Sequence, residues 1–222
     1  MNPSNSTGAI ERLLREIKSE VRQTASYTGR ESLKPEVYEA MRQVNREDFV
    51  RDQDRELAWG NYPLSIGEGQ TISQPYIVAL MTDMLEVDRD SVVLEIGAGS
   101  GYQAAVLSLL VKQVISIEII PQLAQQAQQF LQNLGYNKVA VKCGNGRLGW
   151  PQQAPYDAII VTAASEDIPP ELIRQLKPGG RLVIPIGGQW MAQQLMEISK
   201  DEEGKVIEKS VLPVSFVPLT GG

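Results

Sequence analysis

The sequence contains no histidine and only one cysteine, Cys143. Without imidazole, a Ser-His-Asp triad, a histidine general base and most zinc sites are excluded, and we expect no metal site. A single cysteine cannot form an internal disulfide, which is typical of proteins from a reducing compartment. We interpret Cys143 as a small apolar side chain at the end of a strand rather than as a catalytic thiol. Any enzyme made from this sequence needs chemistry that works without imidazole.

Long apolar runs and basic clusters are also missing. No window of about eighteen apolar residues exists, so we expect no membrane-spanning helix. Residues 1–8 are polar and contain no apolar core of a signal peptide. The net charge is −6, and no basic surface is evident that would attract a polyanion such as DNA or RNA. We therefore expect a cytoplasmic protein, a monomer by default, that binds neither nucleic acid nor membrane.

What is present is an alternation of short apolar runs and amphipathic segments along 222 residues. The spacing predicts helices at residues 10–24, 35–44, 74–85, 103–111, 121–134 and 170–176. Strands are predicted at residues 92–96, 114–118, 139–143, 158–161, 182–184, 193–199 and 205–217, the last two as a hairpin. Residues 46–69 mix charges, aromatics and glycines, and we expect a long loop there.

This alternation predicts the fold class. Continuous apolar strands that alternate with helices indicate a doubly wound, mostly parallel α/β sheet covered on both faces, here with an antiparallel C-terminal hairpin. We expect a single domain over residues 1–222. Within it, residues 1–70 or so form an N-terminal helical segment on the substrate side, and residues from about 71 to 222 form the cofactor-binding core.

A glycine loop follows the first strand of the alternating series. It reads Gly97-Ala98-Gly99-Ser100-Gly101, and a helix is predicted directly after it. Glycines allow a tight turn and a close ligand approach, and the helix start directs free N–H groups and a positive dipole end at the same point. Glu118 ends the next strand, 21 residues after Gly97, where an acidic side chain can accept the two hydroxyl groups of a ribose. Together these features predict a nucleoside cofactor, although the glycines alone could simply form a strand-helix turn.

The loop favours S-adenosylmethionine over a nicotinamide cofactor. The dinucleotide fingerprint has a third glycine at its sixth position, where this sequence has Tyr102. Glu95, just ahead of the loop, suits the cationic methionine end of S-adenosylmethionine better than a pyrophosphate. A nicotinamide-dependent oxidoreductase remains the disfavoured alternative.

Two stretches carry a more specific resemblance. Residues 93–105, through the glycine loop to Tyr102-Gln103-Ala104-Ala105, resemble the first motif of the protein-L-isoaspartate O-methyltransferases. Gly69-Gln70-Thr71-Ile72-Ser73-Gln74-Pro75 is similar to a stretch distinctive of that family. Residues 157–164, 176–185 and 216–219 resemble it too, so the likeness covers about residues 36 to 222.

The resemblance implies a Rossmann-like methyltransferase fold and an activity. The family transfers a methyl group from S-adenosylmethionine, which becomes S-adenosylhomocysteine, to the free carboxylate of L-isoaspartyl residues in damaged proteins and peptides. The ester then closes to a succinimide that reopens partly as aspartate. A carboxylate has a pKa of about 4 and is already a nucleophile at neutral pH, which is consistent with the missing histidine.

The resemblance also assigns residues. It places Ser73 where its hydroxyl can orient the isoaspartyl carboxylate, whereas the local pattern alone favours a helix N-cap for Ser73. The cofactor side comprises Thr71, Ile72, Gln74, Glu95, Gly97, Ala98, Gly99, Ser100, Gly101, Glu118, Ile119, Asn145, Gly146, Thr162 and Thr220. The peptide side comprises Leu64, Ile66, Gly67, Val214, Phe216 and Val217. For Phe216 and Val217, a place in a strand core is the alternative.

Two other functions of the same fold stay open. One is a methyltransferase with a different or specialised peptide acceptor, because a fold does not fix a substrate. The other is a non-catalytic paralogue that binds the cofactor, against which the retained Thr71 and Ser73 argue.

Asn145 is a departure from the family pattern, and it leads to a prediction. The family has Gly-Asp-Gly after the third strand, with the aspartate facing the adenine amino group, whereas this chain has Gly144-Asn145-Gly146. A neutral amide oxygen accepts a weaker hydrogen bond than a carboxylate does. We therefore expect Asn145→Asp to bind S-adenosylmethionine more tightly than the natural chain, as measured by calorimetric titration. Unchanged or weaker binding would contradict this expectation.

Overall fold

The computed structural model of the chain describes residues 3–188 and 192–221. Within these residues, seven strands form one sheet in the order β5-β4-β3-β6-β7-β8-β9. The parallel strands are β3 (Val92–Ile96), β4 (Gln113–Glu118), β5 (Val139–Cys143), β6 (Tyr156–Val161) and β7 (Leu176–Ile186). β8 (Gln193–Lys200) and β9 (Val206–Val214) add antiparallel pairs at one edge. The predicted doubly wound sheet with a C-terminal hairpin is confirmed.

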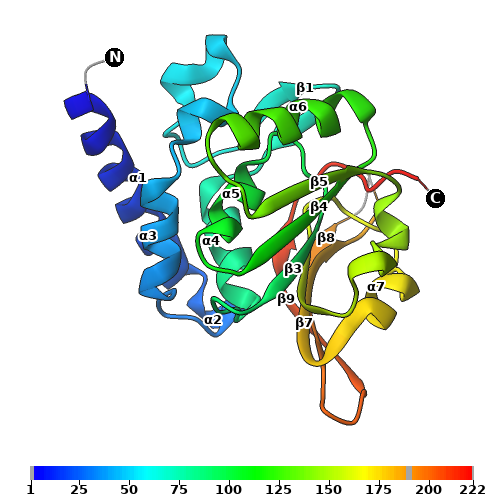
Figure 1. The fold of residues 1–222 in the computed structure, drawn as a ribbon. Helices are drawn as coiled ribbons and strands as arrows, with labels where there is room; N and C mark the ends of the chain where they lie inside the picture. The colour runs from blue at the N-terminus through cyan, green and yellow to red at the C-terminus, as the bar shows by residue number, and fades with distance from the viewer. Residues whose placement is uncertain (1–2, 189–191, 222) are drawn as a thin grey trace.

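Helices cover both faces of this sheet (Figure 1). α4 (Pro75–Met84), α5 (Tyr102–Ser108) and α6 (Pro121–Asn133) pack on one face, and α7 (Pro170–Gln175) packs on the other. Successive side chains of a strand point to opposite faces, so Val93 belongs to the core under α4 and α5, and Leu94 to the core under α7. Burial on both faces explains why the strands are continuous apolar runs rather than alternating ones.

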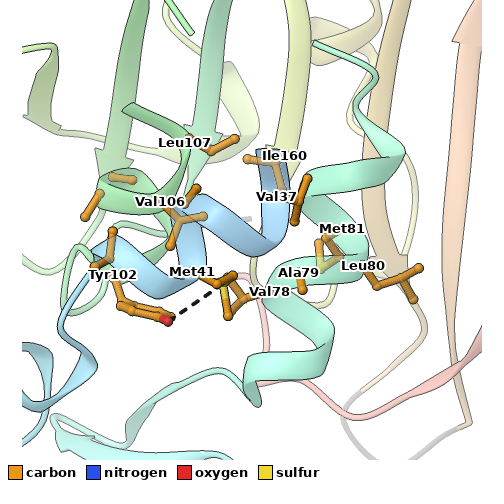
Figure 2. Packing of buried hydrophobic residues seen from close by; sticks show 14 of the residues in the cluster. Val37, Met41, Val78, Ala79, Leu80, Met81, Tyr102, Val106, Leu107 and Ile160 are labelled. Atoms are coloured by element: carbon orange, nitrogen blue, oxygen red, sulfur yellow. Dashed lines mark hydrogen bonds between the residues drawn. The ribbon is translucent and has the colours of Figure 1, made fainter. Parts of the chain in front are cut away.

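The N-terminal segment shares the first of these two cores. It consists of α1 (Pro3–Gln23), α2 (Ala25–Thr28) and α3 (Pro35–Gln43). The predicted apolar face of α1 is buried, with Leu13 and Ile17 fully inaccessible. Figure 2 shows how Met41 of α3 packs between α4 and α5, where the hydroxyl of Tyr102 donates a 3.7 Å hydrogen bond to its sulfur. The N-terminal helices therefore pack directly against the helices that frame the glycine loop.

The long loop predicted for residues 46–69 was wrong. This stretch contains the 3-10 helices η1 (Arg46–Phe49) and η2 (Asp52–Leu57), and β1 (Leu64–Gly67), which pairs antiparallel with β2 (Gln70–Ile72). Glu68 and Gly69 both have positive φ, as the two-residue turn of a tight hairpin requires. Phe49 fixes the other end of the stretch, because its ring packs edge-on against Tyr102 and Phe130.

Several predicted boundaries also shift. β7 begins at Leu176 and runs through Lys177–Gly180, which the sequence indicated as a helix stop. The pairing register between β6 and β7 is irregular at this point. Glycine is needed at position 180, because a Cβ there would lie 2.9 Å from the carbonyl oxygen of Asp157. β9 ends at Val214, so the strand core considered for residues 216–217 was wrong. No helix among the described residues has the length and apolarity needed to cross a bilayer.

Candidate cofactor and acceptor site

The glycine loop lies where the chain reverses its direction of travel across the sheet. From β3 the chain continues to β4 and β5 on one side, and β6 and β7 lie on the other. In open α/β sheets, ligands bind outside the carboxyl ends of the strands at such a switch point. Gly97, Gly99 and Gly101 all have positive φ, which favours glycine over any residue with a side chain. The loop is therefore both correctly placed and built for close approach.

Thr162, at the end of β6, holds the beginning of this loop. Its hydroxyl donates to the carbonyl oxygen of Gly97 at 2.7 Å, and its backbone N–H donates to that of Ile96 at 2.9 Å. A Cβ on Gly97 would lie only 2.4 Å from the Thr162 hydroxyl oxygen. A side chain at position 97 would therefore displace Thr162 and open the loop.

Glu118, at the end of β4, holds the middle of the loop. One carboxylate oxygen accepts from the Gly99 N–H at 2.9 Å, and the other accepts from the Ile120 N–H at 3.0 Å. A carboxylate has about four lone-pair sites. After these two bonds, each oxygen of Glu118 can still accept one ribose hydroxyl, as the sequence predicts.

A cavity opens above these groups. Its lining includes predicted cofactor residues from six parts of the chain: Thr71, Gly97, Gly99, Glu118, Ile119, Gly146, Thr162 and Thr220. Val217, predicted for the peptide side, lines the same cavity. The sequence analysis missed Gln70, Ile96, Ile117, Ile120, Ala163, Pro218 and Leu219. Most of these residues lie at or just after the carboxyl end of a predicted strand, and this position could have identified them.

The C-terminal segment forms one wall of the cavity. Ala164, just beyond β6, donates its N–H to the Val217 carbonyl at 2.8 Å and accepts from the Leu219 N–H at 2.7 Å. These two bonds bring Thr220 to the cavity, as predicted. Phe216 is fixed separately, because its N–H and carbonyl both bond to the side chain of Gln193 at 2.6 and 3.1 Å.

Asn145 lies behind this wall. Its amide nitrogen donates to the Gly221 carbonyl at 2.5 Å, and its amide oxygen accepts from the Arg147 N–H at 3.0 Å, capping η3 (Gly146–Leu148). It is not among the lining residues, although its neighbour Gly146 is. An aspartate at this position would lose the donor to Gly221. The predicted contact of residue 145 with the adenine amino group stays a prediction.

The predicted acceptor residues lie next to the cavity. In the β1–β2 hairpin, Leu64 faces Ile72 across the strands, and Thr71 of β2 lines the cavity. The Ile66 side chain reaches the glycine loop, since a Cβ on Gly99 would lie 3.3 Å from it. The hairpin therefore covers the loop, with Gly67 at its bulged end.

The remaining predicted residues take three different positions. Val214 and Phe216 pack, half-buried, against the core that α4 and α5 cover. Ser100 faces a second cavity, of about 350 Å³, between η1, the hairpin and α6. Ala98, Gly101, Ile72 and Gln74 line neither cavity. A Cβ on Gly101 would lie 3.0 Å from Leu131 of α6.

Ser73 follows β2 directly and precedes α4. The N-cap of α4 is Gln74, which makes no side-chain cap bond, so the interpretation of Ser73 as the cap was wrong. The Ser73 side chain is half-buried, and its hydroxyl has no hydrogen-bond partner among the residues that the structure describes. Its backbone carbonyl, by contrast, accepts from the guanidinium of Arg46 at 3.1 Å. The hydroxyl is free to serve a ligand.

Glu95 is part of β3 and does not line the cavity. The side chain is completely buried, and one oxygen accepts from the Ser116 hydroxyl. The other oxygen has no partner among the described residues. Burial raises the pKa of the Glu95 carboxyl from 4.5 to about 8, so at neutral pH the group is largely protonated. The predicted contact with the methionine end of the cofactor stays a prediction.

The fold and this site define a class I methyltransferase: a Rossmann-like sheet with a glycine loop and an acidic residue at its switch point. The family model for protein-L-isoaspartate(D-aspartate) O-methyltransferase matches residues 22–222. The chain belongs to that family.

Individual relatives agree with this assignment. The chain is 53% identical over 211 residues to protein-L-isoaspartate O-methyltransferase 2 of Syntrophobacter fumaroxidans, covering 95% of this chain and 85% of the relative. A solved protein-L-isoaspartate O-methyltransferase superposes with a TM-score of 0.83 at 27% identity, over 96% of this chain and 66% of the other. A Plasmodium falciparum protein, solved in complex with S-adenosyl-L-homocysteine, shares the fold with a TM-score of 0.77 at 23% identity, over 97% and 98% of the two chains.

The buried Glu95 gives a pH-dependent prediction. Because its pKa is raised in the folded state, the folded chain holds a proton that the unfolded chain releases above about pH 4.5. The associated stability is fully present below the unfolded pKa and is lost as the pH rises toward 8. Glu95→Gln keeps the size and an oxygen for Ser116 but does not titrate.

The free energy of unfolding of Glu95→Gln, relative to the natural chain, should therefore rise by about 1 kcal/mol or more between roughly pH 5 and pH 8. Urea unfolding of both proteins across this range measures the difference. A difference that stays constant with pH would contradict the assignment of a protonated Glu95.

Proposed function

We propose that the chain transfers a methyl group from S-adenosylmethionine to the free carboxylate of L-isoaspartyl residues in proteins and peptides, which begins their repair through a succinimide. Family membership supports this reaction. The observation that carries the proposal is that residues 71–73 run from the cofactor cavity to an unpartnered hydroxyl. Thr71 lines the cofactor cavity, and two residues further on, Ser73 presents a hydroxyl that has no partner among the described residues.

The cavity suits this cofactor. The carboxylate of Glu118 is positioned to accept ribose hydroxyls, and the glycine backbone leaves room for close approach. Ile117, Ile119 and Leu219 offer apolar walls for the adenine ring. When bound, S-adenosylmethionine supplies an electrophilic methyl group on a positively charged sulfur that leaves as a neutral thioether.

The residues of this chain need only to bind and align. The acceptor carboxylate is ionised at neutral pH, so no side chain has to remove a proton from it. The Ser73 hydroxyl donates a hydrogen bond to one carboxylate oxygen and leaves the other free to attack. Alignment of two reactants contributes at best about 7–11 kcal/mol to lowering the barrier, which makes positioning the main task of this site.

The hairpin and the C-terminal strand supply the peptide side. Leu64, Ile66 and Gly67 border the site from β1, and Val214 and Phe216 border it from the end of β9. β1 has one strand partner, β2, among the described residues, and we propose that its other edge forms backbone hydrogen bonds with the peptide. Backbone contacts of this kind accept many different sequences around the damaged residue. We further propose a cytoplasmic monomer that does not act on nucleic acid.

The decisive experiment compares two peptides that differ only in Asp or L-isoAsp at one position. With labelled S-adenosylmethionine, we expect transfer to the L-isoAsp peptide alone. Transfer to neither peptide, with the cofactor bound, would contradict the proposal and favour a cofactor-binding paralogue or another acceptor. Equal transfer to both peptides would exclude the assigned specificity.

Replacing Ser73 by alanine removes the donor to the acceptor carboxylate and little else. We expect kcat to fall by about 10- to 100-fold, because a misaligned acceptor loses positioning. The dissociation constant for S-adenosylhomocysteine should stay within a factor of about two, because Ser73 does not line the cofactor cavity.

Ser32→Ala, at an exposed serine between α2 and α3, is the matched control and should leave both quantities unchanged. Equal losses of turnover and of cofactor affinity in Ser73→Ala would mean that Ser73 has only a structural role.

A further inference from the structure

The geometry points to Arg46 and Glu20 as positioning residues for Ser73. We propose that these two side chains hold the segment between β2 and α4 from opposite sides and thereby aim the Ser73 hydroxyl. The proposal rests on the role of Ser73 proposed above. It explains how Ser73 is held in place, since Ser73 is neither a helix cap nor part of a strand pair.

Arg46 is a completely buried guanidinium at the start of η1. No acidic residue in the described part of the chain lies within salt-bridge distance of it. Instead it donates to three backbone carbonyls: Ala58 at 2.5 Å, Tyr62 at 3.2 Å and Ser73 at 3.1 Å. The guanidinium also lies 5.8 Å from the ring centre of Tyr102. A single side chain therefore joins η1, the stretch before β1 and the Ser73 backbone.

This arrangement is energetically costly. Burying a cation without a counter-ion costs several kcal/mol, and the Nε atom of Arg46 is buried without a partner among the described residues. Burial lowers the pKa of the guanidinium, but an arginine stays charged at neutral pH. An apolar side chain of similar volume would fill the space without this cost. What only arginine supplies is a planar fork of donors that can hold several carbonyls at once.

Glu20 of α1 holds the other side of the segment. Its carboxylate accepts from the Gln74 amide at 3.2 and 3.3 Å and from the Asn61 amide at 2.7 Å. Asn61 in turn accepts from the Tyr76 N–H at 2.9 Å, which satisfies one of the free donors in the first turn of α4. Both residues that Glu20 holds lie next to positions held by Arg46: Asn61 precedes Tyr62, and Gln74 follows Ser73.

These contacts also give the N-terminal helix a function. Glu20 lies just before residue 22, where the match to the family model begins. Thr24, one turn later, shares a 2.6 Å hydrogen bond with the hydroxyl of Tyr76. α1, through Glu20, and Thr24, the residue after its end, therefore reach the start of α4 through polar contacts, in addition to the apolar face of α1.

The first test compares two arginines. Arg46→Met should lower kcat toward an L-isoaspartyl peptide by about 10-fold or more, with S-adenosylhomocysteine affinity changed by less than about 2-fold. Arg46→Lys, which can reach one or two of the carbonyls, should recover part of the loss. Arg30→Met is the control: Arg30 pairs at 3.0 Å with Asp83, near the C-terminal end of α4 and away from Ser73, and its loss should lower the melting temperature without lowering kcat.

The second test uses α1, where a substitution is less disruptive. Glu20→Ala should lower kcat by about 3- to 10-fold, and Glu16→Ala, at an exposed position one turn earlier, should leave it unchanged. Hydrogen-deuterium exchange provides a readout that does not depend on transfer. In Arg46→Met and Glu20→Ala the amides of Ile72, Ser73, Gln74 and Tyr76 should exchange faster, while those of residues 97–101 should keep their protection.

The outcomes separate this inference from the proposed function. Faster exchange at residues 72–76 with a selective loss of kcat supports the positioning role. Natural kcat in folded Arg46→Met and Glu20→Ala, equal losses in the two controls, or unchanged exchange would overturn it. If the natural chain does not methylate the L-isoaspartyl peptide at all, the proposed function fails, and the exchange data alone still decide whether Arg46 and Glu20 hold the segment.

Discussion

The pair of hydrogen bonds that Glu118 accepts from Gly99 and Ile120 is the interaction on which the rest of the site depends. It ties the glycine loop of one strand to the end of the next, at the point where the sheet changes direction. The parallel register of β3 and β4 places Glu118 there, since Ile96 pairs with Ile117. Because the same carboxylate retains free lone pairs, the group that shapes the loop can also bind the ribose.

The cofactor side and the acceptor side of the site are built from different kinds of structure. The sheet holds the cofactor side through contacts between strand ends, which Thr162 and Glu118 provide. Most of the acceptor side consists of short elements before the sheet begins, namely the β1–β2 hairpin and the segment at Ser73. These elements are too short to be stable alone, and polar contacts to α1 and η1 support them. Methyl transfer to a carboxylate needs alignment above all, so such support bears directly on turnover.

Much of the fold could be predicted from the sequence because a strand buried on both faces leaves an unmistakable apolar run, as at residues 92–96. The glycine loop and Glu118 were recognisable for the same reason, since each follows such a strand. Residues 46–72 were not, because 3-10 helices and three- or four-residue strands have no period to detect. In the sequence, nothing distinguishes Arg46 from an exposed charged residue. The structure shows that its partners are backbone carbonyls up to 27 residues away.

The central claim is that cofactor and acceptor meet between the Glu118 carboxylate and the Ser73 hydroxyl. A crystal structure with both S-adenosylhomocysteine and an L-isoaspartyl peptide bound tests it most directly. The account predicts ribose hydroxyls within about 3 Å of the Glu118 oxygens and the isoaspartyl carboxylate within about 3 Å of the Ser73 hydroxyl. A carboxylate bound elsewhere, with the Ser73 hydroxyl facing solvent or the protein, would contradict it.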